Sequence, residues 1–158
     1  MQPLTILNTR EVKRIRDIGI EQFAYFPEED YAYLLSEKNR IFVVNKDLSR
    51  IDLKKVRADK VGLYFAELKD NTIRLSKEGA QLLFNDAKKK KKELKNVVEM
   101  NAEEIKKYFS GVDLEKDLGA ENRFILLKYK VDIIGCAKYK ERKIINFLPK
   151  IHRGEVIV

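Results

Sequence analysis

The sequence predicts an α+β protein in which an N-terminal α/β domain, residues 1–92, is followed by a small mixed β-barrel, residues 93–158. Two observations support this fold class. Each half carries, near its start, an Asn followed three positions later by a Glu, which is the capping box that begins a helix. In each half, the segments after that helix are short, rich in β-branched and aromatic residues, and separated by polar turns, as strands are.

In the first half, Asn8 and Glu11 form the capping box, and we expect the helix to end at Gly19. Ser76 is expected to cap a second helix, which runs into five consecutive lysines, 88–92. Five like charges cannot all be paired locally, so we interpret this run as exposed, at the end of the first domain and in the linker to the second. It is either a solvated helix end or an RNA contact. The two predicted hairpins pair residues 31–35 with 41–44, and residues 61–68 with 72–75.

In the second half, residues 97–100 predict a short strand, and Asn101 with Glu104 predicts a helix through Phe109, with Gly111 just beyond its end. A further helical turn is expected over residues 113–118. The pattern then changes to strands, predicted over residues 124–129, 131–137, 143–148 and 155–158. One helix followed by several short strands favours a mixed barrel over a doubly wound sheet.

The 158 residues include 33 Lys and Arg against 25 Asp and Glu, a net charge of +8. Such a surplus favours a polyanionic partner through phosphate attraction and counterion release, although a merely solubilising surface is the alternative. A single cysteine cannot form an internal disulfide, so we expect a reducing compartment, the cytoplasm. Apolar runs are only a few residues long, and we expect no membrane partner.

Residues that could carry catalysis are few. His152 is the single histidine, and Cys136 lies in an apolar strand, where a buried structural thiol is expected rather than a nucleophile. The sequence contains no glycine-rich nucleotide-binding loop. It therefore predicts no enzyme, no cofactor and no metal site.

The charge pattern near the end of the chain is more informative. From Arg123 to Arg153 there are nine basic residues, opposed only by Asp132 and Glu141. Because residues two apart on a strand share a face, two lysine pairs should each project together, Lys128 with Lys130 and Lys138 with Lys140. The tyrosines that alternate with them, Tyr129 and Tyr139, either stack on RNA bases or belong to the core.

Several of these segments resemble known families. Residues 97–119, a strand and a capped helix followed by Gly111-Val112-Asp113 and Leu118-Gly119, resemble the opening of a PUA domain, and residues 131–137 resemble its small-residue strand. Residues 146–150, with Arg153 beyond, resemble the close of the C-terminal domain of Sun-type RNA cytosine-5 methyltransferases. Residues 1–5 with Arg10, together with the layout of strands before the PUA unit, resemble Nip-type ribosome-biogenesis factors, which pair an α/β pre-PUA domain with a C-terminal PUA domain.

The resemblance implies non-catalytic binding of structured RNA, rRNA or tRNA, in ribosome biogenesis, rRNA processing or RNA modification. Because the chain lacks the methyltransferases' cofactor-binding loop and catalytic domain, it would act as a stand-alone accessory. The helix, the glycine turn and the late strands would form the binding face. With the charge pattern, this predicts the RNA-binding residues Lys106, Lys107, Ser110, Gly111, Lys128, Lys130, Lys138, Lys140, Arg142, Lys143, Lys150 and Arg153.

Two other functions stay open from the sequence. The first is a protein-interaction module that docks on an RNA-modification enzyme or a ribosome-assembly protein, which predicts an exposed apolar patch around Phe23, Tyr25 and Phe26. The second is an RNA-modifying enzyme, which requires a pocket where polar groups converge and acid–base residues have shifted pKa values.

Overall fold

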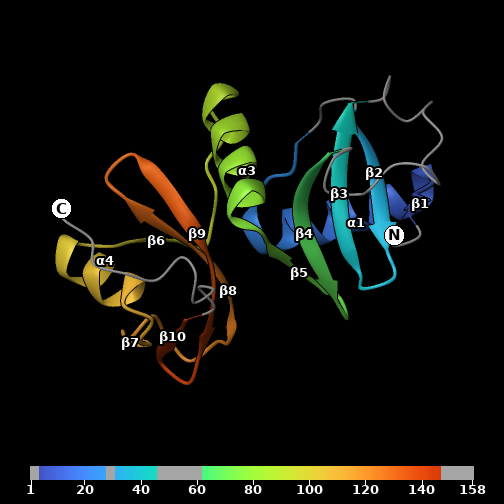
Figure 1. The fold of residues 1–158 in the computed structure, drawn as a ribbon. Coiled ribbons are helices and arrows are strands. Elements are labelled where there is room, and N and C mark those ends of the chain that lie inside the picture. The colour runs from blue at the N-terminus through green and yellow to red at the C-terminus, as the bar shows by residue number, and fades with distance from the viewer. Residues whose placement is uncertain (1–3, 28–30, 46–61, 147–158) are drawn as a thin grey trace. The chain divides into compact units, whose positions relative to one another are not determined.

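The computed structural model describes residues 4–27, 31–45 and 62–146 (Figure 1). The chain divides into two compact units, Met1–Lys95 and Asn96–Val158. In the described residues, the first unit combines two helices with a five-stranded sheet and the second combines one helix with a five-stranded sheet, so the predicted α+β class is confirmed.

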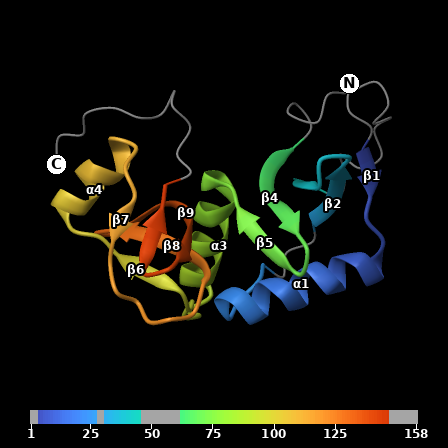
Figure 2. The same cartoon turned by 90° about the horizontal axis from the view of Figure 1, so that it is seen from below.

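The first unit contains an antiparallel sheet in the order β1-β2-β3-β4-β5, in which every strand lies beside its neighbour in the chain. Helix α1 (Thr9–Phe23) runs along one face of this sheet (Figures 1 and 2). Helix α3 (Lys77–Lys89) follows β5 and packs against β4 and β5. The strands are β1 (Leu4–Ile6), β2 (Tyr31–Ser36), β3 (Arg40–Asn45), β4 (Leu63–Lys69) and β5 (Thr72–Leu75). Both predicted hairpins are therefore confirmed, whereas β1 was not predicted.

Helix α1 begins as predicted but ends later. The Asn8 side chain accepts a hydrogen bond from the Glu11 N–H at 2.9 Å, and the Glu11 carboxylate accepts one from the Asn8 N–H at 3.1 Å. The predicted end at Gly19 is wrong, because the helix continues to Phe23, and its C-cap residue Ala24 adopts the left-handed conformation with φ 69°. Gly19 serves packing instead: a Cβ there would lie 2.4 Å from Cδ2 of Phe26.

The second unit contains a sheet in the order β6-β8-β9-β10-β7 that curls into a half-barrel (Figure 1). Strands β6 and β8 pair in parallel, and the other pairs are antiparallel. The strands are β6 (Val97–Glu99), β7 (Leu114–Glu115), β8 (Arg123–Tyr129), β9 (Asp132–Lys140) and β10 (Lys143–Ile145). The single helix of the described part of this unit, α4 (Ala102–Phe109), lies between β6 and β7 in the chain.

The capping box of α4 is confirmed, with the Asn101 side chain accepting from the Glu104 N–H at 2.8 Å and the Glu104 carboxylate from the Asn101 N–H at 3.0 Å. The predicted helical turn over residues 113–118 is wrong. Leu114 and Glu115 form β7, and Leu114 is buried in the core beside β10. The predicted strand over 143–148 is described only as far as residue 146, and the one over 155–158 lies outside the described residues.

Helix α4 closes the core of the second unit by burying Ile105 and Tyr108 against the sheet. Tyr139 on β9 is fully buried there. Its hydroxyl accepts a hydrogen bond from the Leu118 N–H at 2.7 Å and donates one to the Gly119 carbonyl at 2.8 Å. These two hydrogen bonds attach the loop before β8 to the core. In the described part of the chain, no helix combines the length and the apolar character that crossing a membrane requires.

Candidate nucleic-acid interface

The last turn of α4 presents two of the predicted residues, Lys106 and Lys107, to solvent. The helix then stops within two residues: the Ser110 hydroxyl donates to the Lys107 carbonyl at 2.6 Å, and the Gly111 N–H donates to the Tyr108 carbonyl at 3.0 Å. Gly111 has φ 97°, a conformation that disfavours residues with a Cβ. The predicted helix end and glycine turn are therefore present, with both lysines at the negative end of the helix dipole.

Asn146 fastens this turn to the end of β10. Its side-chain amide donates to the carbonyl oxygens of Tyr108 at 2.6 Å and Val112 at 3.0 Å. Its backbone N–H donates to the Asp113 carboxylate at 2.7 Å. The helix end, the glycine turn and β10 are thus held as one piece. Sequence reasoning placed Asn146 in a family pattern but gave it no role, because its partners lie more than thirty positions earlier in the chain.

The β9–β10 hairpin carries three further predicted residues, Lys140, Arg142 and Lys143. Lys140 and Lys143 are a cross-strand pair that flanks the turn. Glu141 and Arg142 fill the turn with φ 52° and 63°, the conformation of a type I′ hairpin turn. Strand β10 is only three residues long, so this turn and the glycine turn lie about 10 Å apart along it. We call the residues that border β10 in this way the β10 face: Lys106, Lys107, Ser110, Gly111, Lys140, Arg142 and Lys143.

Acidic residues from earlier in the chain reduce the net charge of this region. Arg142 forms an ion pair with Asp117 at 2.8 Å, and Lys143 lies opposite Glu115 in the β10–β7 ladder. On β8, Lys128 lies 3.7 Å from Glu99. Counting acids only between residues 123 and 153 therefore overstated the local positive charge, because sheet pairing brings in acids from residues 99–117.

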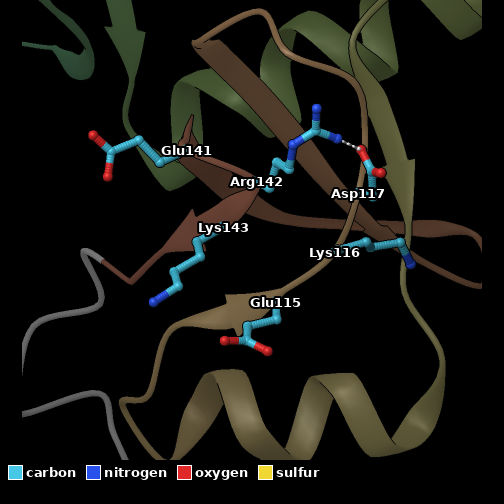
Figure 3. Close-up of a pocket in the computed structure, with 6 residues that line it drawn as sticks. All are labelled: Glu115, Lys116, Asp117, Glu141, Arg142 and Lys143. Atoms are coloured by element: carbon cyan, nitrogen blue, oxygen red, sulfur yellow. Dashed lines mark hydrogen bonds and ion pairs between the residues drawn. The ribbon is translucent and has the colours of Figure 1, made fainter.

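A hollow of about 370 Å³ lies between β7 and the β9–β10 turn (Figure 3). Arg142 points toward Asp117 inside it, whereas Glu141 points away from that pair (Figure 3). Lys116 is held by Glu104 at 2.9 Å. The hollow is lined by three basic and three acidic side chains, so it offers both hydrogen-bond donors and acceptors to a polar ligand. The lining residues are Glu115, Lys116, Asp117, Glu141, Arg142 and Lys143.

The ion pair with Lys116 shifts the titration of Glu104. Burial alone would raise the pKa of this carboxyl, but the hydrogen bond from the Asn101 backbone and the Lys116 ammonium lower the pKa below its ordinary value. Glu104 therefore stays ionised at neutral pH and anchors the loop after β7 to the start of α4.

The remaining predicted basic residues lie outside the β10 face. Lys128 and Lys138 also contact other side chains, Glu99 and Phe124 respectively. Strand β9 extends through Lys140, so Lys138 and Lys140 share a face as predicted, with the Lys138 ammonium 4.6 Å from the centre of the Phe124 ring. Strand β8 ends before Lys130, so the strand period does not extend to that residue and its predicted pairing with Lys128 is wrong. Lys130 lies in the β8–β9 turn, at the far end of a nine-residue strand from Lys140, about 25 Å away. Lys150 and Arg153 lie outside the described residues.

The two tyrosines were open to a base-stacking role. Tyr139 is fully buried and cannot stack on RNA, which makes it a core residue. Tyr129 is half-buried and packs against the same core, with the Lys130 ammonium 5.3 Å from its ring centre. Cys136 is half-buried rather than buried, on the side of β9 that carries Lys138. Burial, and secondarily the nearby Cys136 thiol, raises the pKa of Tyr108 to about 12, so this core hydroxyl stays protonated.

The apolar patch expected of a protein-interaction module is not exposed. Phe23, Tyr25 and Phe26 are 0%, 7% and 3% exposed, respectively. They belong to the core of the first unit, where the Tyr25 hydroxyl donates to the Asp86 carboxylate. Within the described ranges, no three His, Cys, Asp or Glu side chains gather as a metal site requires.

Comparison with protein families matches residues 95–153 to the family described as the methyltransferase RsmF PUA domain. The match spans β6 through β10 and the β10 face. No curated protein matches the chain. The second unit is therefore a PUA-type domain, similar to the C-terminal domain of Sun-type methyltransferases, and it follows an α/β region. The PUA domain is an RNA-binding domain, so the match supports RNA binding in general.

Proposed function

We propose that this protein binds structured RNA, ribosomal or transfer RNA, and catalyses no reaction on it. In this proposal it acts in the cytoplasm, in ribosome biogenesis or RNA modification, with residues 1–92 as a pre-PUA domain and residues 93–158 as the RNA-binding domain. The observation that carries the proposal is the PUA match over residues 95–153, on a unit whose glycine turn follows two exposed lysines, Lys106 and Lys107.

The β10 face has the electrostatics that phosphate binding requires. Lys106, Lys107 and Lys140 are exposed, and no carboxylate of the described residues lies within ion-pair distance of them. Their backbones are fixed by the α4 cap and by the β9–β10 ladder. Charges at fixed spacing can match one arrangement of phosphates, which gives shape selectivity as well as affinity.

Binding of a labelled stem-loop RNA across a salt series tests the proposal. The dissociation constant should rise steeply with salt, with a log–log slope of about 0.7–0.9 for each phosphate neutralised. The double variant Lys106→Ala/Lys107→Ala should weaken binding and flatten that slope. Lys13→Ala, at an exposed position of α1, is the matched control. A salt-independent constant, or a double variant that behaves like the control, would reject the proposal.

Selectivity should reside in the late strands. Replacing Lys138, Lys140 and Arg142 by alanine should remove discrimination between a cognate RNA and random RNA, because these side chains project from an ordered hairpin. The melting temperature serves as the folding control, since Lys138 also contacts Phe124. Discrimination that survives the triple substitution would move the selective contacts elsewhere on the domain.

The absence of catalysis is tested by incubation with a labelled methyl donor and total RNA. We expect no transfer of label. Transfer that persists in Cys136→Ala would contradict the proposal, and transfer abolished by that substitution would identify Cys136 as a nucleophile.

A further inference from the structure

The lysine run ends helix α3 in an ordered cap rather than in a linker. Lys88 and Lys89 form the last turn of α3, and Lys90 is the C-cap residue. The Lys91 N–H donates to the Lys88 carbonyl at 3.1 Å, and the Lys92 N–H donates to the Ala87 carbonyl at 2.8 Å. These two bonds define a Schellman motif, so the backbone beneath the lysines is fixed.

The conformation of Lys91 is costly for a lysine. Its φ of 57° places it in the left-handed region, at the position where such caps favour glycine. Helix stability alone does not account for lysine here, because the favourable interaction of a cation with the helix dipole is smaller than the cost of the left-handed conformation for a residue with a Cβ. The cap thus carries a charge where an uncharged glycine would be more stable.

Within the run, Lys90 differs from its neighbours. Its ammonium lies 3.9 Å from the carboxylate of Asp86, a buried residue that also accepts the hydrogen bond of Tyr25. The other four lysines are exposed, and none forms an ion pair with a described carboxylate: Lys88, Lys89, Lys91 and Lys92. One lysine therefore belongs to the fold, and four offer unbalanced charge on an ordered backbone.

We propose that the α3 cap, Lys88, Lys89, Lys91 and Lys92, is a second RNA contact that binds the phosphate backbone without reading base sequence. This inference rests on the proposed function, because it assigns a further contact to the same RNA. Ammonium groups on flexible stems bind phosphate as point charges and lack the rigid planar fork by which a guanidinium fixes the geometry of a contact. The cap should therefore add affinity equally for cognate and unrelated RNA.

Lys91→Gly is the sharpest test in the full chain, because its effects on stability and on binding have opposite signs. Relieving the left-handed lysine should raise the melting temperature by roughly 2–5 °C. Removing one phosphate contact should weaken binding of a labelled stem-loop RNA roughly two- to five-fold at low salt and lower the salt slope by about 0.7–0.9. Lys77→Ala is the control, since Lys77 is exposed at the opposite end of the same helix, about 18 Å away.

A broader variant extends the test. The variant combines Lys91→Gly with Lys88→Gln, Lys89→Gln and Lys92→Gln. It should weaken the binding of stem-loop RNA and of random RNA by the same factor, more than ten-fold at low salt, because roughly four phosphate contacts are lost. Dissociation constants equal to those of Lys77→Ala would overturn the inference. A loss of affinity confined to one of the two RNAs would overturn it too. So would a loss of binding to phosphatidylserine vesicles with RNA binding unchanged, which would assign the cap to a membrane surface.

The same titrations separate this inference from the proposed function. If Lys106→Ala/Lys107→Ala weakens binding and the cap variants do not, the α3 cap is excluded while the PUA proposal stands. If only the cap variants weaken binding, the α3 cap stands and the β10 face is excluded.

Discussion

The side-chain amide of Asn146 donates a hydrogen bond of 2.6 Å to the Tyr108 carbonyl, joining the residue after β10 to the last turn of α4. The same amide group also binds the Val112 carbonyl. One side chain thus closes the glycine turn from both sides, and the geometry of the β10 face depends on it.

Substituting Asn146 should therefore affect both stability and binding. Asn146→Ala leaves two carbonyl oxygens without this donor, so we expect the free energy of unfolding to fall by about 1–3 kcal/mol. Asn146→Asp should be worse, because its carboxylate would face those oxygens and the Asp113 carboxylate. Urea denaturation measures both variants, and an Ala variant as stable as the wild type would show that the amide is not the linking group.

Tyr139→Phe tests whether this ring belongs to the core or to the interface. The substitution leaves the Leu118 N–H and the Gly119 carbonyl without their partner, so we expect a loss of about 1–3 kcal/mol in unfolding free energy. The RNA dissociation constant, measured well below the melting temperature, should stay unchanged. A weakened constant with unchanged stability would contradict the core assignment.

Asp117→Asn should strengthen RNA binding a few-fold at low salt. The substitution removes the carboxylate that pairs with Arg142, while the remaining amide oxygen can still accept from the Gly119 N–H. Both partners of the pair are more than half exposed, so stability should change by less than about 1 kcal/mol. Fluorescence anisotropy across a salt series checks the effect, with Glu121→Gln, an exposed residue of the same loop, as the control.

Glu104→Gln should be less stable than the wild type at neutral pH, and the difference should vanish in acid. The pKa of Glu104 in the folded protein is lower than its ordinary value of 4.5, so its ionised form stabilises the fold above that pH. The contribution is lost as the pH falls through the folded pKa. Glutamine keeps an oxygen for the Asn101 N–H, so the difference reports the charge. A difference that persists well below pH 4 would point to packing.

Local signals predicted the elements whose causes are local. Asn8 and Asn101 each form the capping box that their spacing predicted, because a capping box involves only four consecutive positions. Gly19 was wrongly predicted to end the helix. Its lack of a side chain allows close packing of Phe26, a tertiary contact that the local sequence does not reveal. The two-residue strand β7 was missed because only its pairing with β10 makes it a strand.

Only part of the candidate site was predicted, because only some of its features have local causes. The strand period correctly placed Lys138 and Lys140 on one face. It could not show that Asp117 lies beside Arg142, or that Asn146 holds the glycine turn, because these contacts join segments far apart in sequence. A surplus of basic residues along the chain is therefore a weaker guide to surface charge than the same count made across paired strands.

The parallel pairing of β6 with β8 has a consequence for how the second unit opens. Among its described strand pairs, it alone is parallel, and it joins Val97 to Leu126, whereas β8–β9 and β9–β10 are hairpins. The segment between β6 and β8 is longer than a hairpin turn, so bringing these two strands together costs more chain entropy. An edge strand of three residues forms few hydrogen bonds to offset that cost. Amide protons of β6 should thus exchange with solvent sooner than those in the middle of β9, and the start of the unit should fray before its centre.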